Sequence, residues 1–210
     1  MNYYQHPAIS NSMLSNYEKQ LFNLPSWGNR NFANAFGQLV HCLILEKDCD
    51  CVDVSMLSIN ELETAKFVAI NAITHPFIKW LRQWTSKEKE IYWSEQNTGL
   101  PCKSKIDSLF KKTVIDLKTT TAKTEKAFRK SIIDFNYHRQ GAFYVDSVKA
   151  HRFIIVGLQK QAPFAIWKIE ISKAELQDGR KKYLQLLKHG FKNGHFDQLL
   201  TQNLNHEKGN

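Results

Sequence analysis

The sequence contains no apolar stretch near the roughly 20 residues that a membrane-spanning helix needs. Its first residues, 2–5, are polar, which is not the pattern of a signal peptide. Internal repeats and low-complexity linkers are also absent. We therefore expect a cytoplasmic protein without membrane contact and with one continuous domain over residues 1–200. Residues 201–210 are too polar to support a core, so we expect a disordered tail there.

Cysteine is scarce, and the four that occur are Cys42, Cys49, Cys51 and Cys102. Cys49 and Cys51 are spaced C-x-C, whereas common zinc and iron-sulfur sites use C-x-x-C, and no cysteine follows Cys102. We therefore expect four reduced thiols and no iron-sulfur cluster. A surface zinc site at Cys49 and Cys51 is the less favoured alternative.

Acidic residues are outnumbered, because 29 Lys and Arg face 20 Asp and Glu, which gives a net charge of +9. Such a balance favours a polyanionic partner. Part of the charge lies on a predicted helix. Lys126 and Lys130 are one turn apart there, and Lys123 is nearly one turn from Lys126. This stripe can contact phosphates, although a solvated helix face would have the same pattern.

Hydrophobic residues make up 42% of the chain and aromatic residues 12%, so a packed core is expected. Helical periodicity of the apolar residues predicts helices over residues 10–21, 33–46, 60–73, 76–86, 124–134, 137–148 and 172–188. Strand-like segments lie at 90–96, 102–110, 113–118, 151–159 and 163–170. This order predicts an α/β fold, with a central mixed β-sheet flanked by helices.

Two aspartates and a lysine lie on two adjacent predicted strands that a tight turn at residues 111–112 joins. Asp116 and Lys118 are two residues apart and therefore point to the same face of their strand. In a hairpin, Asp107 on the first strand falls close to Asp116. Clustered carboxylates repel one another, and a divalent cation such as Mg²⁺ relieves that repulsion. The lysine can then orient water or stabilise charge on a phosphate. Taken alone, the same residues could be the solvated face of a hairpin.

Two predicted helices carry further candidates for this site. His41 follows Gly37 by one helical turn, and the missing side chain of Gly37 would let a strand or a metal approach closely. On the other helix, Gln140 and Tyr144 are one turn apart and can face the same cleft. By itself, each pattern is equally typical of ordinary helix packing.

Together and in this order, Gly-x-x-x-His, Asp, Asp-x-Lys and Gln-x-x-x-Tyr resemble the PD-(D/E)XK nuclease superfamily. The resemblance is closest to its exodeoxyribonuclease VIII-like branch, related to the RecB-type nuclease domains. Residues 4–14, with a serine before a predicted helix, also resemble the start of that branch. The resemblance covers about residues 4–170 and implies a restriction-endonuclease-like core. One departure is Ile106, which stands where proline often precedes the aspartate.

The resemblance implies a role for each matching residue. His41, Asp107, Asp116 and the backbone carbonyl of Leu117 would bind Mg²⁺ or Mn²⁺, and Lys118 would be the catalytic lysine. Gln140 and Tyr144 would line the site and help to hold the DNA backbone and Lys118. Glu95 matches an acidic position of this branch and is a possible accessory carboxylate, or simply a solvated strand end. Candidate DNA contacts are Lys103, Lys105, Lys123, Lys126, Arg129, Lys130, His138 and Arg139.

The implied activity is hydrolysis of DNA phosphodiester bonds by a metal-activated water, which leaves a 5′-phosphate. In this branch the enzyme is an exonuclease on linear double-stranded DNA, in recombination, repair or a phage context. Possible partners are further copies of the chain in a ring and a single-strand annealing recombinase. Two alternatives stay open. One is an endonuclease of the same fold, and the other is a DNA-binding module without catalysis.

Overall fold

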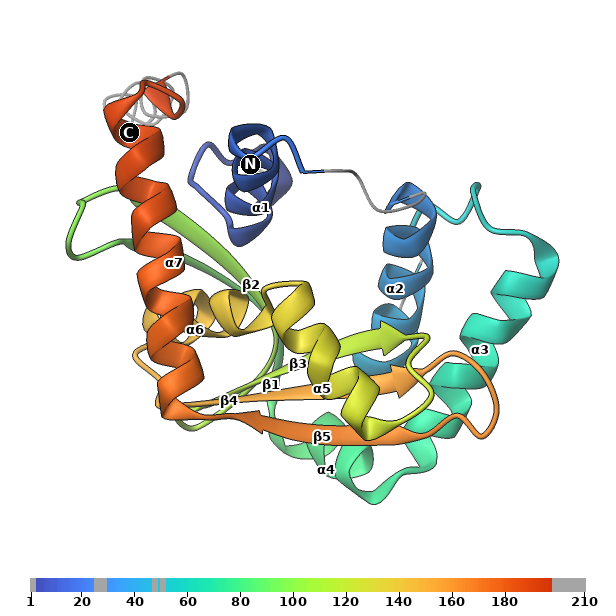
Figure 1. Cartoon of the computed structure of the whole chain (residues 1–210). Coiled ribbons are helices and arrows are strands. Elements are labelled where there is room, and N and C mark those ends of the chain that lie inside the picture. The colour runs from blue at the N-terminus through green and yellow to red at the C-terminus, as the bar shows by residue number, and fades with distance from the viewer. Residues whose placement is uncertain (1–2, 25–29, 47–48, 50–51, 198–210) are drawn as a thin grey trace.

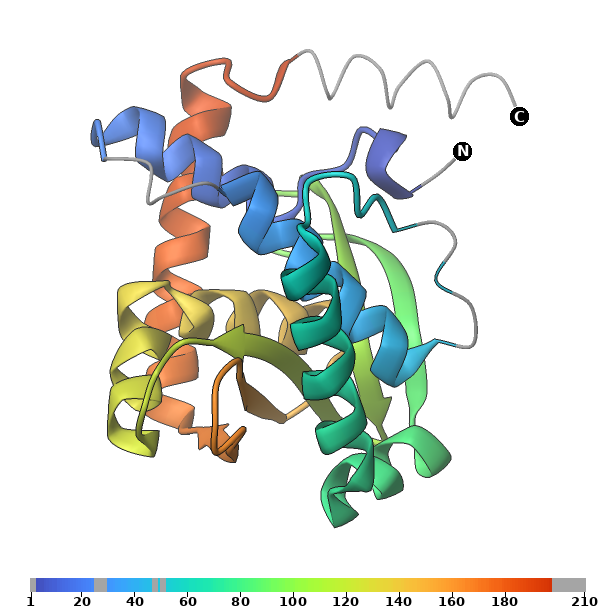
Figure 2. The same ribbon diagram turned by 90° about the vertical axis from the view of Figure 1, so that its right-hand side faces the viewer.

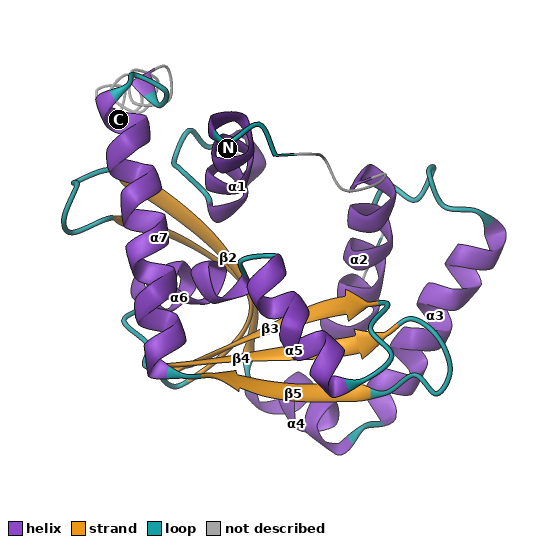
Figure 3. Ribbon diagram, in the orientation of Figure 1, coloured by secondary structure: helices purple, strands orange, loops and turns teal. Residues whose placement is uncertain are grey.

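Five strands form one sheet whose spatial order follows the chain, β1-β2-β3-β4-β5. The strands of this computed structural model are β1 (Ser86–Ser94), β2 (Pro101–Phe110), β3 (Thr113–Thr120), β4 (Arg152–Gln159) and β5 (Ile166–Ile171). Neighbours are antiparallel except for β3 and β4, which are parallel. The predicted mixed sheet is thus confirmed (Figure 3). The structure describes residues 3–24, 30–46, 49 and 52–197.

Helices cover both faces of the sheet (Figure 1). The elements that share one hydrophobic cluster with the sheet are α1 (Asn11–Leu21), α5 (Glu125–Asp134), α6 (Tyr137–Ser147) and α7 (Lys173–Lys192). A second cluster contains α2 (Arg30–Leu45), α3 (Ile59–Thr74) and α4 (Pro76–Trp84). A short 3₁₀ helix, η1, spans Tyr3–Gln5. Figure 2 shows α2 and α3 next to each other on their side of the sheet. The arrangement is a three-layer α/β/α core.

Side-chain caps explain why several helices begin where the sequence predicts. The hydroxyl oxygen of Ser10 accepts the Met13 N–H before α1, at 3.3 Å. Before α7, Ser172 accepts the Glu175 N–H and the Glu175 carboxylate accepts the Ser172 N–H, at 3.2 and 2.9 Å. Each cap satisfies backbone N–H groups that have no partner within the helix. The serine-capped first helix is therefore confirmed.

Two strand starts differ from the prediction. β1 begins at Ser86 instead of residue 90, because β2 is long enough to pair with the charged segment that precedes the apolar part of β1. β5 begins at Ile166 instead of residue 163, because Phe164 has a φ of 56° and interrupts the extended chain. The rest of the predicted order of elements is confirmed.

The expectation of four reduced thiols is wrong for Cys42 and Cys49, which form a disulfide. Their Cα atoms lie 5.6 Å apart, within the range that a disulfide spans. Cys102 is a buried free thiol. Cys51 and the predicted disordered tail, 201–210, lie outside the described residues.

The hairpin of β2 and β3 determines where the chemistry can occur. The two strands pair only at Ser108↔Ile115, Leu109↔Val114 and Phe110↔Thr113, next to the predicted turn, where Lys111 has a φ of 51°. Beyond these pairs β3 continues beside β4 and β2 continues beside β1. The strands therefore separate, and side chains enter between them. No helix within the described part of the chain is long and apolar enough to cross a membrane.

Candidate active site

Asp107 is the first residue of β2 beyond the paired part of the hairpin. Its Oδ2 atom accepts the Leu117 N–H of β3 at 2.7 Å, so a carboxylate takes the place of the missing strand carbonyl. The N–H and C=O of one residue in an extended strand lie on the same edge. The Leu117 carbonyl therefore faces the same edge as Asp107, where the resemblance expects a metal ligand.

Asp116 and Lys118 lie together on β3, as the two-residue alternation predicts. Asp116 is 1% exposed, and its Oδ1 atom accepts a hydrogen bond from Gln140 Nε2 of α6 at 2.9 Å. Lys118 Nζ lies 2.7 Å from Asp116 Oδ2. The structure thus brings together an aspartate, a lysine and a glutamine that the sequence places up to 24 residues apart.

Burial dominates the electrostatics of the two aspartates. It raises the pKa of Asp116 to about 6, because Lys118 offsets only part of the desolvation and Asp107 adds repulsion. Burial also raises the pKa of Asp107 above its ordinary value. For Lys118, burial acts to lower the pKa, but the two carboxylates outweigh it and raise the pKa. Two carboxylates and one ammonium leave an excess of negative charge that a cation can compensate.

His41 reaches this group from α2. Its Nδ1 atom lies 3.4 Å from Asp107 Oδ2. Burial, and then the charge of Lys118, lower the pKa of His41, so the ring is neutral near pH 7 and able to coordinate a metal. Gly37 does face β3, but a Cβ atom there would lie 3.8 Å from Thr119 Oγ1, an ordinary contact. The approach of β3 therefore does not depend on the missing side chain of Gly37.

Glu88 on β1 is a candidate that the sequence did not reveal. The pairs on either side, Lys87↔Ser108 and Lys89↔Ile106, place Glu88 opposite Asp107. Glu88 has a φ of 49°, an uncommon conformation for a residue other than glycine inside a strand. Its Oε2 atom pairs with Lys105 Nζ at 2.9 Å. Burial and the neighbouring Asp107 raise the pKa of Glu88.

The donor atoms of this region fit a divalent cation. One ligand atom each from His41, Glu88 and Asp107 lies within 4.8 Å of the others. Nearby, Asp116 Oδ2 is buried and receives no hydrogen bond of normal geometry from the described residues, although it is ion-paired with Lys118. A buried oxygen with an open lone pair is suited to a cation. Carboxylate oxygens and one imidazole are ligands that Mg²⁺ or Mn²⁺ accepts.

Helix α6 forms the other wall of the site. Gly141, which follows Gln140, lets α6 lie against β4, since a Cβ atom there would come within 2.4 Å of the Phe153 ring. Burial and the Asp116 carboxylate raise the pKa of Tyr144, which places this hydroxyl near the aspartate as a neutral group. Sequence reasoning missed Tyr137, whose ring centroid lies 5.3 Å from Lys118 Nζ.

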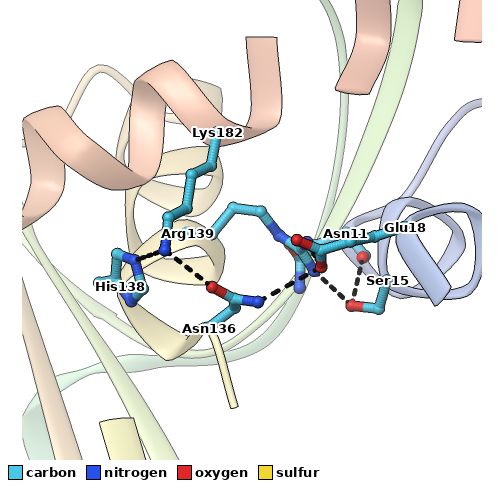
Figure 4. A network of polar contacts seen from close by, with 7 residues as sticks. All are labelled: Asn11, Ser15, Glu18, Asn136, His138, Arg139 and Lys182. Carbon is cyan, nitrogen blue, oxygen red and sulfur yellow. Dashed lines mark hydrogen bonds and ion pairs between the residues drawn. The ribbon is translucent and has the colours of Figure 1, made fainter. Parts of the chain in front are cut away.

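Three basic residues predicted to contact DNA are instead buried. Lys103 is 4% exposed, and its ammonium donates to the backbone carbonyls of Tyr3 and His6. Arg139 is 1% exposed and binds three residues of α1, as Figure 4 shows: Asn11, Ser15 and Glu18. His138 is also 1% exposed and bonds to Lys182 (Figure 4). Positive charge suggested exposure, but tertiary partners compensate these side chains inside the protein.

Glu95 also departs from expectation. It follows β1, and its carboxylate accepts the backbone N–H groups of Asn97 and Thr98, at 2.8 to 3.1 Å. The side chain therefore stabilises the turn between β1 and β2. Glu88, by contrast, lies in a group with His41 and Asp107 that could hold a metal ion.

The remaining basic candidates have different surroundings. Lys123, Lys126 and Lys130 are exposed on α5 or just before it. Arg129 forms an ion pair with Glu175 at 2.7 Å, and Lys105 is paired with Glu88. These three exposed lysines can therefore still contact a substrate, whereas Lys103, His138 and Arg139 are buried.

A mixed sheet between helical layers, with two aspartates and a lysine where two strands separate, defines a nuclease-type α/β core. The chain belongs to the family described as "PDDEXK-like domain of unknown function (DUF3799)", whose model matches residues 55–193, more than half of the sequence. The matched segment contains Glu88, Asp107, Asp116, Lys118 and Gln140, and it leaves out α2 with His41. No curated protein matches the chain.

Solved structures share this fold. A protein from Eubacterium rectale that is named as an exonuclease superposes with a TM-score of 0.69 at 18% identity, over 92% of this chain and 85% of its own. A phage-related exonuclease from Haemophilus somnus 129PT matches with a TM-score of 0.47 at 12% identity, over 91% of this chain and 84% of its own. The likeness to the first protein confirms the nuclease fold.

Proposed function

We propose that the protein is a metal-dependent deoxyribonuclease that hydrolyses phosphodiester bonds in DNA. The observation that carries the proposal is the convergence of Asp107, Asp116 and Lys118 at the point where β2 and β3 separate. Membership of the PDDEXK-like family supports it. A buried excess of carboxylates is unfavourable in a purely structural role, so its presence favours a catalytic one.

The metal would be Mg²⁺ or Mn²⁺, held by His41, Asp107, Asp116 and the carbonyl of Leu117. We add Glu88 to this set because its carboxylate lies in the same cluster as His41 and Asp107. A bound divalent cation lowers the pKa of a coordinated water and stabilises charge on the scissile phosphate.

The other residues would orient the reacting groups. Lys118 Nζ, beside Asp116 and over the ring of Tyr137, can donate a hydrogen bond to a phosphate oxygen or to the attacking water. Gln140 fixes one oxygen of Asp116, and the other oxygen lies beside Lys118. Tyr144, neutral because its pKa is raised, can donate its hydroxyl proton to the DNA backbone.

We further propose exonuclease action on linear double-stranded DNA, in recombination, repair or a phage context. The exonuclease name of the Eubacterium rectale structure and the net charge of +9 support this choice. A ring of several copies and a single-strand annealing recombinase are the partners that such an activity would use.

The test is digestion of end-labelled linear duplex DNA with Mg²⁺ or Mn²⁺, beside a closed circle of the same sequence. We expect loss of the linear DNA alone, and no loss with Asp116→Ala. Cleavage of the circle would replace the exonuclease proposal with an endonuclease. A folded protein that cleaves neither substrate would contradict the catalytic proposal and favour a binding module.

Two variants separate the proposed roles within the site. Lys118→Ala should lower the cleavage rate by about a hundredfold or more while Mn²⁺ still binds, because the lysine acts on the reacting groups. Asp107→Ala should lose both cleavage and most Mn²⁺ binding, and Glu88→Gln should weaken Mn²⁺ binding by about tenfold. Isothermal titration calorimetry measures the binding. Near-normal turnover by Lys118→Ala would refute the assigned role.

A further inference from the structure

A cavity of about 400 Å³ lies beyond the carboxyl ends of β3 and β4. Its lining includes Phe32 and Phe36 of α2, Thr121 after β3, and Lys160 and Phe164 after β4. The Lys160 N–H donates to the Thr120 carbonyl at 2.9 Å, which ties the two strand ends together. Ligands of α/β sheets commonly bind at the carboxyl ends of parallel strands.

The cavity lies next to two elements of the proposed active site, α2 and β3. On α2, Phe36 precedes His41 by five residues, which is about 7.5 Å along the helix. Thr121, the residue after β3, follows Lys118 by three residues, about 10 Å of extended chain. The cavity therefore adjoins the elements that carry His41, Asp116 and Lys118.

The lining combines aromatic rings with a cation. Lys160 Nζ lies 4.3 Å from the centroid of the Phe36 ring. Among the described residues, no carboxylate oxygen lies within 4.0 Å of this ammonium. Glu61 also lines the cavity and interacts electrostatically with Lys160, while its Oε2 atom accepts the N–H and hydroxyl of Ser58, at 2.8 and 2.6 Å. A cation that forms no direct ion pair and lies beside aromatic rings suits a group that is both planar and anionic.

Phe164 is fixed at the cavity before any ligand arrives. Its φ of 56° is unfavourable for a phenylalanine, and two hydrogen bonds hold it: its N–H donates to the Gln161 carbonyl at 2.8 Å, and its carbonyl accepts from Asn71 Nδ2 at 2.8 Å. Its ring lies 4.7 Å from that of Phe67 on α3. The half-buried ring therefore has a defined place, which lowers the entropy that binding must overcome.

We propose that this cavity binds one unstacked nucleotide of the DNA strand that is cut at the metal site. The base would stack on the aromatic rings and the phosphate would pair with Lys160. The inference rests on the proposed function. A base inside a duplex cannot enter such a cavity, so the substrate at the moment of cleavage would be an end whose last nucleotides are unpaired. Stacking on aromatic rings would make this preference independent of sequence.

The test uses single-stranded oligonucleotides with phosphorothioate linkages and Ca²⁺, which keep the strand intact. Each oligonucleotide carries a single 2-aminopurine, a fluorescent base that stacking quenches. Its position moves one nucleotide further from the end in each successive oligonucleotide. We expect quenching at one or two adjacent positions with the wild-type protein. Phe164→Leu should lose this quenching and bind about tenfold more weakly, whereas Phe164→Tyr should keep both.

Phe135→Leu is the matched control, because Phe135 is 53% exposed and does not line the cavity, and it should leave quenching unchanged. Equal quenching in Phe164→Leu and wild type would overturn the proposal, as would no binding or no quenched position in wild type. If Phe164→Leu does not fold, Phe32→Leu replaces it with the same expected result. If Phe164→Leu breaks a dimer without affecting the oligonucleotide, the cavity binds protein and the proposal is wrong.

Parallel digestion of linear duplex DNA with Mn²⁺ separates this proposal from the proposed function. If wild-type protein quenches 2-aminopurine through Phe164 but cleaves nothing, the cavity proposal stands and the nuclease proposal is wrong. If cleavage is normal and Phe164→Leu does not change the quenching, the nuclease proposal stands and the cavity proposal is wrong.

Discussion

At the scale of single residues, the pKa of Asp116 predicts how the metal site responds to pH. Burial raises this pKa to about 6, so the carboxylate loses its charge as the pH falls through 6. The pKa of His41 is lowered, so the imidazole stays available over the same range. A metal and a proton compete for Asp116. Mn²⁺ affinity should therefore be nearly constant above about pH 7 and fall toward tenfold per pH unit below about pH 6.

Calorimetric titration of Mn²⁺ between pH 5 and 8 measures this dependence. Asp116→Asn should bind Mn²⁺ more weakly and show no change of slope near pH 6. A flat profile down to pH 5 in the wild-type protein, or a change of slope that persists in Asp116→Asn, would contradict the assignment.

The candidate site was predictable where short-range rules apply. Asp116 and Lys118 share a face because strand residues alternate, and the hairpin brings Asp107 close. Glu88 was not predictable, since its charged neighbours suggest a solvated strand and its left-handed φ occurs without glycine or asparagine. Arg139 was misjudged because only the tertiary structure supplies the acidic partner that permits its burial.

At the scale of elements, Arg139 joins two helices that lie far apart in the sequence. Its guanidinium binds Glu18, Ser15 and Asn11 of α1, and it is adjacent to Gln140 on α6. Replacing a buried partner leaves the other charge uncompensated. Arg139→Met should therefore lower the free energy of unfolding by about 3 kcal/mol, as measured by urea denaturation.

Arg152→Met is the control for this prediction. Arg152 also pairs with a glutamate, Glu170, but the two side chains are 55% and 47% exposed. Exposed ion pairs contribute little to stability, so this variant should unfold at nearly the same urea concentration as wild type. Equal losses in the two variants would mean that burial is not what makes the Arg139 contact strong.

The order and type of the elements followed from periodicity and capping, while their ends depended on neighbours. Apolar spacing and capping serines identified helices such as α1 and α7. The start of β1 depends on pairing with β2, and the start of β5 depends on the backbone of Phe164. Local sequence does not contain such long-range pairing. The disulfide between Cys42 and Cys49 was missed for a related reason, because it requires knowing that the two cysteines lie close together in space.

At the scale of the whole molecule, the net charge of +9 predicts DNA binding that weakens with salt. Lys126 is exposed and borders a hollow that also contains Arg129 and Lys168. If Lys126 contacts one phosphate, Lys126→Ala should bind DNA severalfold more weakly at low salt. The slope of log K against log salt should then decrease by about one.

Fluorescence anisotropy of a labelled duplex at several salt concentrations gives this slope. Lys66→Ala is the control, since Lys66 is equally a surface lysine, with its side chain 57% exposed, but lies on α3 and pairs with Glu63. Lys66→Ala should leave the slope unchanged. The same decrease in both variants would indicate diffuse attraction without a contact at Lys126.

The short pairing of β2 with β3 also bears on how the sheet can move. Three residue pairs join these strands, whereas eight join β3 to β4. The sheet therefore has a seam, with β1 and β2 on one side and β3 to β5 on the other. Separation along the seam breaks far fewer backbone hydrogen bonds than separation elsewhere. The proposed ligands come from both sides of it, Glu88 and Asp107 from one and Asp116 from the other. Local separation of the strands along the seam would thus open the proposed metal site itself, and a bound cation would hold the two parts of the sheet together.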